Sequence, residues 1–310
     1  MNNAPDSPRP TVSVLISTYE RTAELILTLE NLRKQTYALH EILVIDDASP
    51  SQTVERVVKE GFPEVTYHRL PKNHGLIGAR KIGMRTCTGK YVLNLDDDSW
   101  PVAPDAVERA VALMEQDEKI GVLALNIMKT GCPPTWPESI HRFLAPQYTG
   151  CGYVARREVI LEHGEYVPEF VRQGEESDRS IRLIGAGYKI VAEPAIVVEH
   201  AVSPKNRDNK KAISLNFVNA LRREILRAPY LLMPVGTARA CAYAFNNRRK
   251  IDWQLVRSNL KLRGPNSVSA FFKMRRPVGM AAYTRWHLMS YRLSRTTHDV
   301  PRYAKGYRTA

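Results

Sequence analysis

Three consecutive carboxylates, Asp96, Asp97 and Asp98, directly follow the apolar run 91–95 of the sequence. Adjacent carboxylates repel one another, and each resists the loss of water that burial brings. Such a cluster most simply binds a hard divalent cation, because Mg²⁺ and Mn²⁺ take oxygen ligands from carboxylates and substrate phosphates. A metal ion held in this way can neutralise a diphosphate leaving group. The alternative is a solvated acidic turn ahead of the helix that we expect after Pro104.

Two more apolar runs end in polar side chains. Residues 17–19, Ser-Thr-Tyr, follow the run 11–16, and Asp46 and Asp47 follow the run 41–45. Continuous apolar runs of this length are typical of strands that are buried on both faces of a parallel sheet. Ligands of such sheets bind beyond the carboxyl ends of the strands. The three polar strand ends therefore predict one shared binding site.

The segments between these runs predict the elements that must position the polar groups. Amphipathic segments with a helical period alternate with the apolar runs, which predicts an α/β fold with a doubly wound, mostly parallel sheet. After residue 205 the apolar runs give way to amphipathic helices. The expected strands are 11–18, 41–46, 65–70, 90–95 and 120–128, and the expected helices are 22–36, 53–60, 75–87 and 103–117.

The overall composition is that of a globular protein. The 310 residues are 44% hydrophobic and 25% charged, which suits one large domain or two smaller ones. The first residues lack the features of a secretory signal, and no run approaches the roughly 18–20 apolar residues of a membrane span. Four scattered cysteines without a CxxC spacing predict neither a zinc site nor a disulfide framework: Cys87, Cys132, Cys151 and Cys241. We expect a reduced, cytoplasmic setting.

The formal net charge of +13 is unevenly distributed. Residues 1–200 carry 22 Lys and Arg against 28 Asp and Glu, whereas residues 201–310 carry 23 against 4. The basic last third predicts an anionic neighbour such as a membrane surface or a phosphorylated substrate, although a helical extension packed on the rest of the chain explains it equally well. No nucleic-acid motif accompanies the charge, so a nucleic-acid partner is not expected. Aromatic residues among the basic ones suit either a membrane-surface helix or a packing face: Phe271, Phe272, Trp286 and Tyr291.

Five segments together resemble the family 2 glycosyltransferases of the GT-A fold. They occur in the family's order over roughly residues 11–200: VSVLISTYER, EILVIDDAS, NHGLIGARKIGMRTCTGKYVLNLDDDS, GCGYVARREVI and GEESDRSIRLIGAGYKIVAEPAIVVEH. The resemblance implies a Rossmann-like GT-A catalytic domain over 11–204, with a nucleotide-sugar half at about 11–100 and an acceptor half at about 101–204. The remaining segments are a flexible N-terminus (1–10), a basic helical C-terminal region (205–295) and a flexible tail (296–310).

The resemblance also implies roles in donor binding. Ser17, Tyr19 and Arg21 would lie at the nucleotide pocket, and Asp47 would recognise the base. Arg80 would lie near the carboxylates of the triplet. The simpler interpretations are an Asx turn or helix cap for Asp47 and a surface charge for Arg80.

The triplet corresponds to the Asp-x-Asp motif of that family. Asp98 would be the metal ligand, with Asp96 as a further ligand, and Asp96 and Asp97 would face the ribose and the sugar. His200 follows the last expected strand, where some GT-A enzymes have a third metal or diphosphate contact, although a lone histidine is more often structural. The implied cofactor is Mn²⁺ or Mg²⁺.

The acidic sequence Glu175-Glu176-Ser177-Asp178 matches the family's Glu-Asp-x-Asp motif, whose second residue is the base. Glu176 would therefore take the proton of the acceptor hydroxyl. Glu175 and Asp178 remain alternatives, and the cluster also suits the first turn of a helix, where the helix dipole favours negative charge. Lys81 departs from the family, which usually has Asn there, and the SPSQT segment (49–53) lacks the usual Asp.

The implied function is an inverting, metal-dependent glycosyltransferase. It would transfer sugar from a nucleotide-diphosphate sugar to a hydroxyl on a glycan, lipid-linked saccharide or secondary metabolite. Cell-envelope or extracellular polysaccharide biosynthesis is the expected process, in the cytoplasm or at the inner face of the membrane. One alternative is a nucleotidyltransferase, but no glycine-rich phosphate loop with a lysine lies near the first strand. The other is a non-catalytic protein that binds sugar nucleotides or anionic lipid, although the carboxylate sets are intact.

Overall fold

The computed structural model describes residues 9–137, 139–167, 169–170, 173–202, 208–260 and 274–294. Residues 1–8 and 295–310, which hold nearly all of the flexible ends expected from the sequence, lie outside this description, as do Phe271 and Phe272.

The first half of the fold is a parallel sheet whose strands follow the predicted apolar runs. The spatial order is β3-β2-β1-β4, and each neighbouring pair is parallel. Nearly every residue of the three central strands is buried, which is why they carry continuous rather than alternating apolar residues. The bounds are β1 Val12–Thr18, β2 Glu41–Asp46, β3 Val65–Arg69 and β4 Tyr91–Asp96.

Antiparallel pairs enter the sheet in its second half. Strand β8 (Gly152–Arg156) lies between β4 and β6 (Ile120–Lys129) and is antiparallel to both. Strand β9 (Lys189–His200) runs parallel to β6, and two short strands, β5 (Ser99–Pro101) and β7 (Phe143–Leu144), pair with it antiparallel. The mostly parallel α/β sheet is confirmed, and β8 is the strand that joins its two halves.

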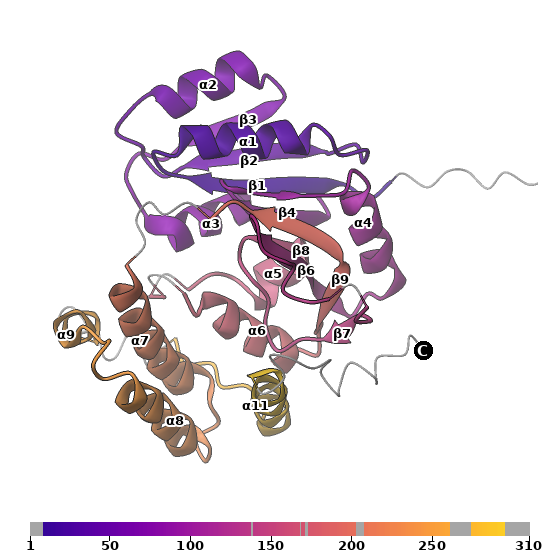
Figure 1. The fold of residues 1–310 in the computed structure, drawn as a ribbon. Coiled ribbons are helices and arrows are strands. Elements are labelled where there is room, and N and C mark those ends of the chain that lie inside the picture. The colour runs from indigo at the N-terminus through magenta and orange to yellow at the C-terminus, as the bar shows by residue number, and fades with distance from the viewer. Residues whose placement is uncertain are drawn as a thin grey trace, which may run out of the picture.

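Helices cover both faces of the sheet because alternate side chains of the strands point to opposite sides (Figure 1). Ile16 of β1 packs in the cluster that holds Leu25 and Leu29, whereas Leu15 packs with Met84 in the cluster of the other face. Each fully buried aliphatic side chain of this kind contributes about 1.5–3 kcal/mol. The covering helices are α1 Thr22–Leu32, α2 Thr53–Gly61, α3 Gly75–Thr86, α4 Ala106–Gln116, α5 Arg157–His163 and α6 Glu175–Gly185.

The chain after β9 forms further helices: α7, α8 and α9 lie at the lower left of Figure 1, and α11 lies below α6 at the lower centre. Helix α11 packs on α6 through Ile181, Tyr283 and Trp286, and the Trp286 indole N–H donates to the carbonyl of Pro146 at 2.7 Å. Trp286 therefore serves packing, since only 4% of it is exposed. The helices are α7 Asn209–Arg227, α8 Met233–Asn246, α9 Trp253–Leu260 and α11 Met280–Ser294. Within the described residues, no helix is both long and apolar enough to cross a bilayer.

Part of the basic charge of these helices is used inside the protein. Arg227 is buried and forms an ion pair with Asp178 of α6. Arg275 is also buried and donates to the carbonyls of Ile225 and Ala228 at the end of α7. Arginine suits such positions because its rigid, fully charged guanidinium offers several donors at once. The packing interpretation of the basic region therefore accounts for some of its arginines.

Candidate active site at the carboxyl ends of the strands

The three polar strand ends lie side by side. Ser17 of β1 is level with Asp96 of β4, and Thr18 of β1 is level with Asp46 of β2. The Ser17 hydroxyl is buried and has no hydrogen-bond partner in the described part of the chain. Such an orphaned hydroxyl beside a carboxylate is typical of a position where a ligand completes the hydrogen bonding.

Arg21 is held by the carboxylate triplet. Its Nη1 lies 3.0 Å from Asp97 Oδ1, and its Nη2 lies 2.5 Å from Asp98 Oδ2. The Thr18 hydroxyl donates to Asp97 Oδ2 at 2.9 Å, and the Thr28 hydroxyl donates to the Asp97 carbonyl. The resemblance placed Asp97 toward the sugar, but its buried carboxylate faces the interior and ties the turn after β4 to the end of β1.

Asp97 and Asp98, the two carboxylates of the triplet that contact Arg21, have pKa values shifted in opposite directions. Burial raises the pKa of Asp97 to about 8, and the neighbouring Asp96 adds to the rise against the charge of Arg21. Burial alone also raises the pKa of Asp98, but the hydrogen bond and charge of His200, together with Arg21, outweigh it and hold that pKa below its usual range. Asp98 is therefore the stable anion of the pair.

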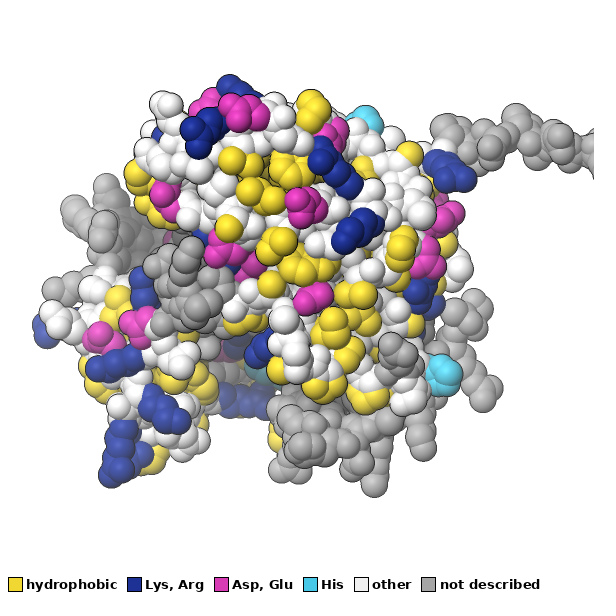
Figure 2. Space-filling view, turned by 45° about the horizontal axis from the view of Figure 1, so that its top comes forward, with side chains coloured by type: hydrophobic (Ala, Val, Ile, Leu, Met, Phe, Trp, Pro, Cys, Tyr) yellow, Lys and Arg dark blue, Asp and Glu magenta, His cyan; other side chains and the backbone are white. Residues whose placement is uncertain are grey.

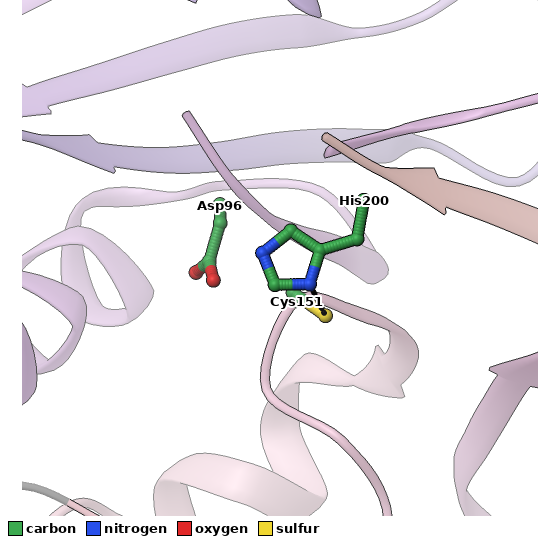
Figure 3. Close-up of side chains that lie close together, drawn as sticks. All are labelled: Asp96, Cys151 and His200. Atoms are coloured by element: carbon green, nitrogen blue, oxygen red, sulfur yellow. Dashed lines mark hydrogen bonds between the residues drawn. The ribbon is translucent and has the colours of Figure 1, made fainter. Parts of the chain in front are cut away.

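Asp96, Cys151 and His200 form a group whose potential ligand atoms all lie within 4.8 Å of one another (Figure 3). His200 Nδ1 is 3.5 Å from Cys151 Sγ, and His200 Nε2 is 3.2 Å from Asp98 Oδ1. Burial raises the pKa of the Cys151 thiol well above its usual value, and hard cations prefer oxygen ligands to sulfur. A hard cation would take the partly exposed Asp96 and His200, while Asp98 orients the imidazole.

The sequence predicted Asp98 as the metal ligand, with Asp96 and His200 as further ligands, and the fold brings these three together. Asp98, however, is buried against Arg21 and His200, so Asp96 and His200 are the more accessible two. Cys151 was missed as their neighbour. The residue has no metal-ligand spacing in the sequence, and it reaches Asp96 only because the turn before β8 lies against the end of β4.

Arg80 connects the triplet to the acidic start of α6. Its guanidinium forms an ion pair with Asp96, lies 3.5 Å from Glu175 and donates to the carbonyl of Gly150 at 3.1 Å. Burial and the adjacent Glu176 raise the pKa of Glu175 to about 8. A Cβ on Gly150 would lie 2.6 Å from Arg80 Nη1 and 2.7 Å from Glu176 Oε1, so any other residue there would require these side chains to shift.

Glu176 and Asp178 have different surroundings although they are two residues apart. Glu176 is half-buried and lines a cavity of about 690 Å³ that opens toward the C-terminal helices. Asp178 is fully buried, 2.6 Å from Arg227 and 2.8 Å from Arg182. Burial raises the pKa of Asp178, but these two arginines outweigh burial and keep it ionised. Full burial between two arginines makes Asp178 less suited than Glu176 to act as the base, and its ion pair with Arg227 joins α6 to α7.

Asp47 and Tyr19 flank the other side of the site. Asp47 is buried, and its Oδ1 accepts the backbone N–H of His74, which precedes α3, at 2.7 Å. Burial raises the pKa of Asp47. Tyr19 is 40% exposed. The Asp47 contact ties the turn after β2 to the start of α3, and it is neither an Asx turn nor a side-chain cap of that helix.

The sequence model of the family described as Glycosyl transferase family 2 matches residues 13–167. The amylovoran biosynthesis glycosyltransferase AmsB of Erwinia amylovora is 25% identical over 274 residues, which is 80% of this chain and 87% of AmsB. An uncharacterized glycosyltransferase of Haemophilus influenzae is 36% identical over 115 residues, 36% of this chain and only 37% of that protein.

Solved structures share the fold. The S. aureus TarS fragment 1–349 in complex with UDP-GlcNAc has a TM-score of 0.58 at 16% identity, over 96% of this chain and 91% of that one. GalNAc-T7 with UDP, GalNAc and Mn²⁺ has a TM-score of 0.62 at 18% identity, over 86% of this chain and 59% of that one. At such identities the likeness shows the GT-A fold alone.

Proposed function

Because the chain belongs to glycosyl transferase family 2 and is a glycosyltransferase, we propose that it transfers a sugar from a nucleotide-diphosphate donor to an acceptor hydroxyl with inversion. The observation that carries this proposal is the position of Arg80, which contacts both Asp96 at the strand ends and Glu175 beside the candidate base. The two carboxylate sets expected for donor and acceptor thus adjoin one another.

In this proposal Glu176 accepts the proton of the acceptor hydroxyl. The acceptor oxygen forms its bond to the anomeric carbon while the bond from that carbon to the diphosphate oxygen breaks. Glu176 suits the role because it is half-buried at the wall of a cavity, whereas Glu175 is 3% exposed and its pKa is raised. Arg80 stays charged beside them and orients the carboxylates.

Asp96 and His200 would hold Mn²⁺ or Mg²⁺, because carboxylate and imidazole suit such ions and both side chains are partly exposed. When bound, the ion supplies positive charge to the leaving diphosphate. Ser17, Tyr19 and Asp47 would bind the nucleoside, with the orphaned Ser17 hydroxyl donating to the donor. The presence of Mn²⁺ in the GalNAc-T7 structure supports this assignment.

Thermal unfolding with UDP, GDP, dTDP and CDP, each with and without Mn²⁺, tests the donor site. One nucleotide should raise the midpoint in a metal-dependent way, since at 100 times Kd binding adds about 2.7 kcal/mol. Asp96→Asn should remove the shift, and the exposed Asp105→Asn serves as the matched control. A panel without any shift in the presence of metal would refute the proposal.

We also propose a process and a place for the reaction. AmsB is named for amylovoran biosynthesis, which supports a role in cell-envelope or extracellular polysaccharide biosynthesis. A strain lacking the gene should lose a surface polysaccharide, and expression of the Glu176→Gln variant should not restore it. Unchanged polysaccharide in the deletion strain would contradict this role.

The surface of α8 supports contact with an anionic membrane at the inner face. Figure 2 shows basic side chains with apolar ones between them on the C-terminal helices, at the lower left. Tyr230, Leu231 and Phe245 are 74%, 74% and 65% exposed. Phe245 lies beside the exposed basic residues 248–250, and the Arg248 guanidinium is 4.7 Å from its ring centre, whereas Tyr230 and Leu231 precede the other end of α8. Basic and apolar side chains exposed together are typical of proteins that bind lipid headgroups. Flotation with vesicles containing phosphatidylglycerol should recover the protein at low salt, and less of it after Phe245→Asp.

A further inference from the structure

The cavity beside Glu176 continues into a second hollow. The first cavity, of about 690 Å³, lies between α6 and the helices α7, α8 and α11. The second, of about 350 Å³, lies between α8 and α11. Arg239, His287 and Tyr291 line both, so the two hollows adjoin at these three side chains.

The two hollows differ in chemical character. Beside Glu176 the walls combine exposed aromatic rings such as Tyr243 and Tyr291 with hydrogen-bonding groups such as Gln147 and Asn216. A saccharide has apolar C–H faces as well as hydroxyls, and this mixture matches both. The hollow between α8 and α11 is lined instead by aliphatic side chains that include Leu232, Val235 and Leu288. Val235 and Leu288 are about half exposed, so this groove presents apolar surface that nothing in the described chain covers.

The positively charged side chain of Arg239 lies where the two hollows adjoin. Arg239 is exposed and hydrogen-bonds His287 Nδ1 at 2.9 Å, and within the described residues it forms no ion pair with a carboxylate. Its neighbour Arg223 differs, since Arg223 Nη2 lies 2.9 Å from Glu224. Of these two arginines, Arg239 is the one whose charge is available to an anion.

We propose that the acceptor is an anionic amphiphile, a saccharide joined through a phosphate or diphosphate to a long apolar chain. The saccharide would occupy the cavity beside Glu176, the anionic group would contact Arg239, and the apolar chain would lie in the groove between α8 and α11. This inference rests on the proposed function, because it takes Glu176 as the residue that receives the proton of the acceptor hydroxyl. It assigns the C-terminal helices to acceptor recognition, through continuity of the groove with the cavity and through the charge of Arg239 where the two adjoin.

Calorimetric titration of the full chain with farnesyl diphosphate tests the proposal without knowledge of the sugar. EDTA would be present, so that the probe's diphosphate gains nothing from a metal ion, and inorganic pyrophosphate reports any binding of the diphosphate alone. Farnesyl diphosphate should bind at least about tenfold more tightly than inorganic pyrophosphate and than the uncharged alcohol farnesol, a difference of about 1.4 kcal/mol. Equal affinity for farnesyl diphosphate and pyrophosphate would overturn the proposal, because the groove would then contribute nothing.

Substitutions test whether binding depends on the side chains where the two hollows adjoin or only on the positive charge of the protein. Arg239→Glu and Leu288→Asp should each weaken farnesyl diphosphate binding by about tenfold or more. Arg56→Glu makes the same charge change on exposed residue 56 of α2, outside both hollows, and should leave the affinity unchanged. Equal loss in Arg239→Glu and Arg56→Glu would overturn the proposal in favour of unspecific attraction.

Nucleotide binding with Mn²⁺ distinguishes failure of this inference from failure of the proposed function. If a nucleotide stabilises the protein but farnesyl diphosphate does not bind, the glycosyltransfer proposal stands and the amphiphilic acceptor is wrong. If no nucleotide binds, the proposed function itself is wrong. Nucleotide stabilisation should be the same in wild type, Arg239→Glu and Leu288→Asp, which also shows that the variants are folded.

Discussion

At the scale of single residues, the candidate site depends on how neighbouring carboxylates are separated by their surroundings. Asp96, Asp97 and Asp98 are consecutive, yet one pairs with Arg80, one is buried with a raised pKa, and one is an anion held by His200 and Arg21. Glu175 is buried and has a raised pKa, whereas Glu176 is half-buried at the wall of the cavity. Surroundings that separate the pKa values of neighbouring carboxyl groups are typical of sites that transfer protons.

Glu176→Gln tests the candidate base. We expect turnover to fall by about 10²–10⁴-fold, the usual contribution of a positioned base, with nucleotide binding nearly unchanged. Glu162→Gln is the control, since the Glu162 side chain is 74% exposed on α5. Turnover close to wild type would remove Glu176 from the role.

Gly150→Ala tests whether the turn before β8 positions the catalytic side chains. The new Cβ would lie within 2.7 Å of Arg80 and Glu176, so one of them must move, and we expect turnover to fall at least about tenfold. Gly61→Ala is the matched control, because a Cβ at Gly61 meets no atom within 4 Å. Equal activity of the two variants would show that this close approach does not matter.

At the scale of elements, α6 carries both the candidate base and the anchor that holds it. Asp178, on the same turn as Glu176, is joined to Arg182 of its own helix and Arg227 of α7. The ion pair thereby fixes the start of α6 against the C-terminal helices. This gives the basic region a structural task in addition to the acceptor contacts proposed above.

Asp178→Asn should therefore destabilise the protein. Removing one partner of a buried ion pair leaves unpaired charge in the interior, which costs about 3–5 kcal/mol. Denaturant unfolding measures this loss, and Asp117→Asn, which breaks a surface ion pair with Lys189, should cost about 1 kcal/mol or less. Similar losses in both variants would mean that the α6–α7 contact contributes little to stability.

At the scale of the whole molecule, Glu224 joins the C-terminal helices to one another. It is buried on α7 and contacts Arg223, with Tyr283 and His287 of α11 on the other side. Burial raises the pKa of Glu224, but the hydrogen bond of His287, the charge of Arg223 and the Tyr283 hydroxyl outweigh it and lower the pKa to about 2. The carboxylate is therefore part of what keeps these helices together.

The sign of its pH dependence follows from that shift. A folded-state pKa below the unfolded value of about 4.5 gives stability that is complete above about pH 5 and is lost as the pH falls toward 2. Wild type should exceed Glu224→Gln by roughly 3 kcal/mol or less near neutral pH, and the difference should shrink between pH 5 and pH 3. Thermal unfolding of both across this range measures it, and a pH-independent difference would contradict the assignment.

Much of the donor side was predictable from the sequence because its signals are local. Apolar runs and helical spacing gave the strands β1 to β4, and polar residues directly after those runs gave Ser17, Asp47 and the Asp96–Asp98 triplet. In a parallel sheet the carboxyl ends of neighbouring strands meet at one edge, so these residues must come together once the strands form.

Only the tertiary structure decided what each of these groups faces. Asp97 turns inward to Arg21, Asp178 meets Arg227 from a helix 49 residues further along the chain, and Cys151 reaches His200 through the turn before β8. The two hollows that meet at Arg239 exist only where α6, α7, α8 and α11 pack together. Strand and helix periods are set by neighbours in the chain, whereas the direction, burial and partners of a side chain are set by residues distant in sequence, which no local pattern records.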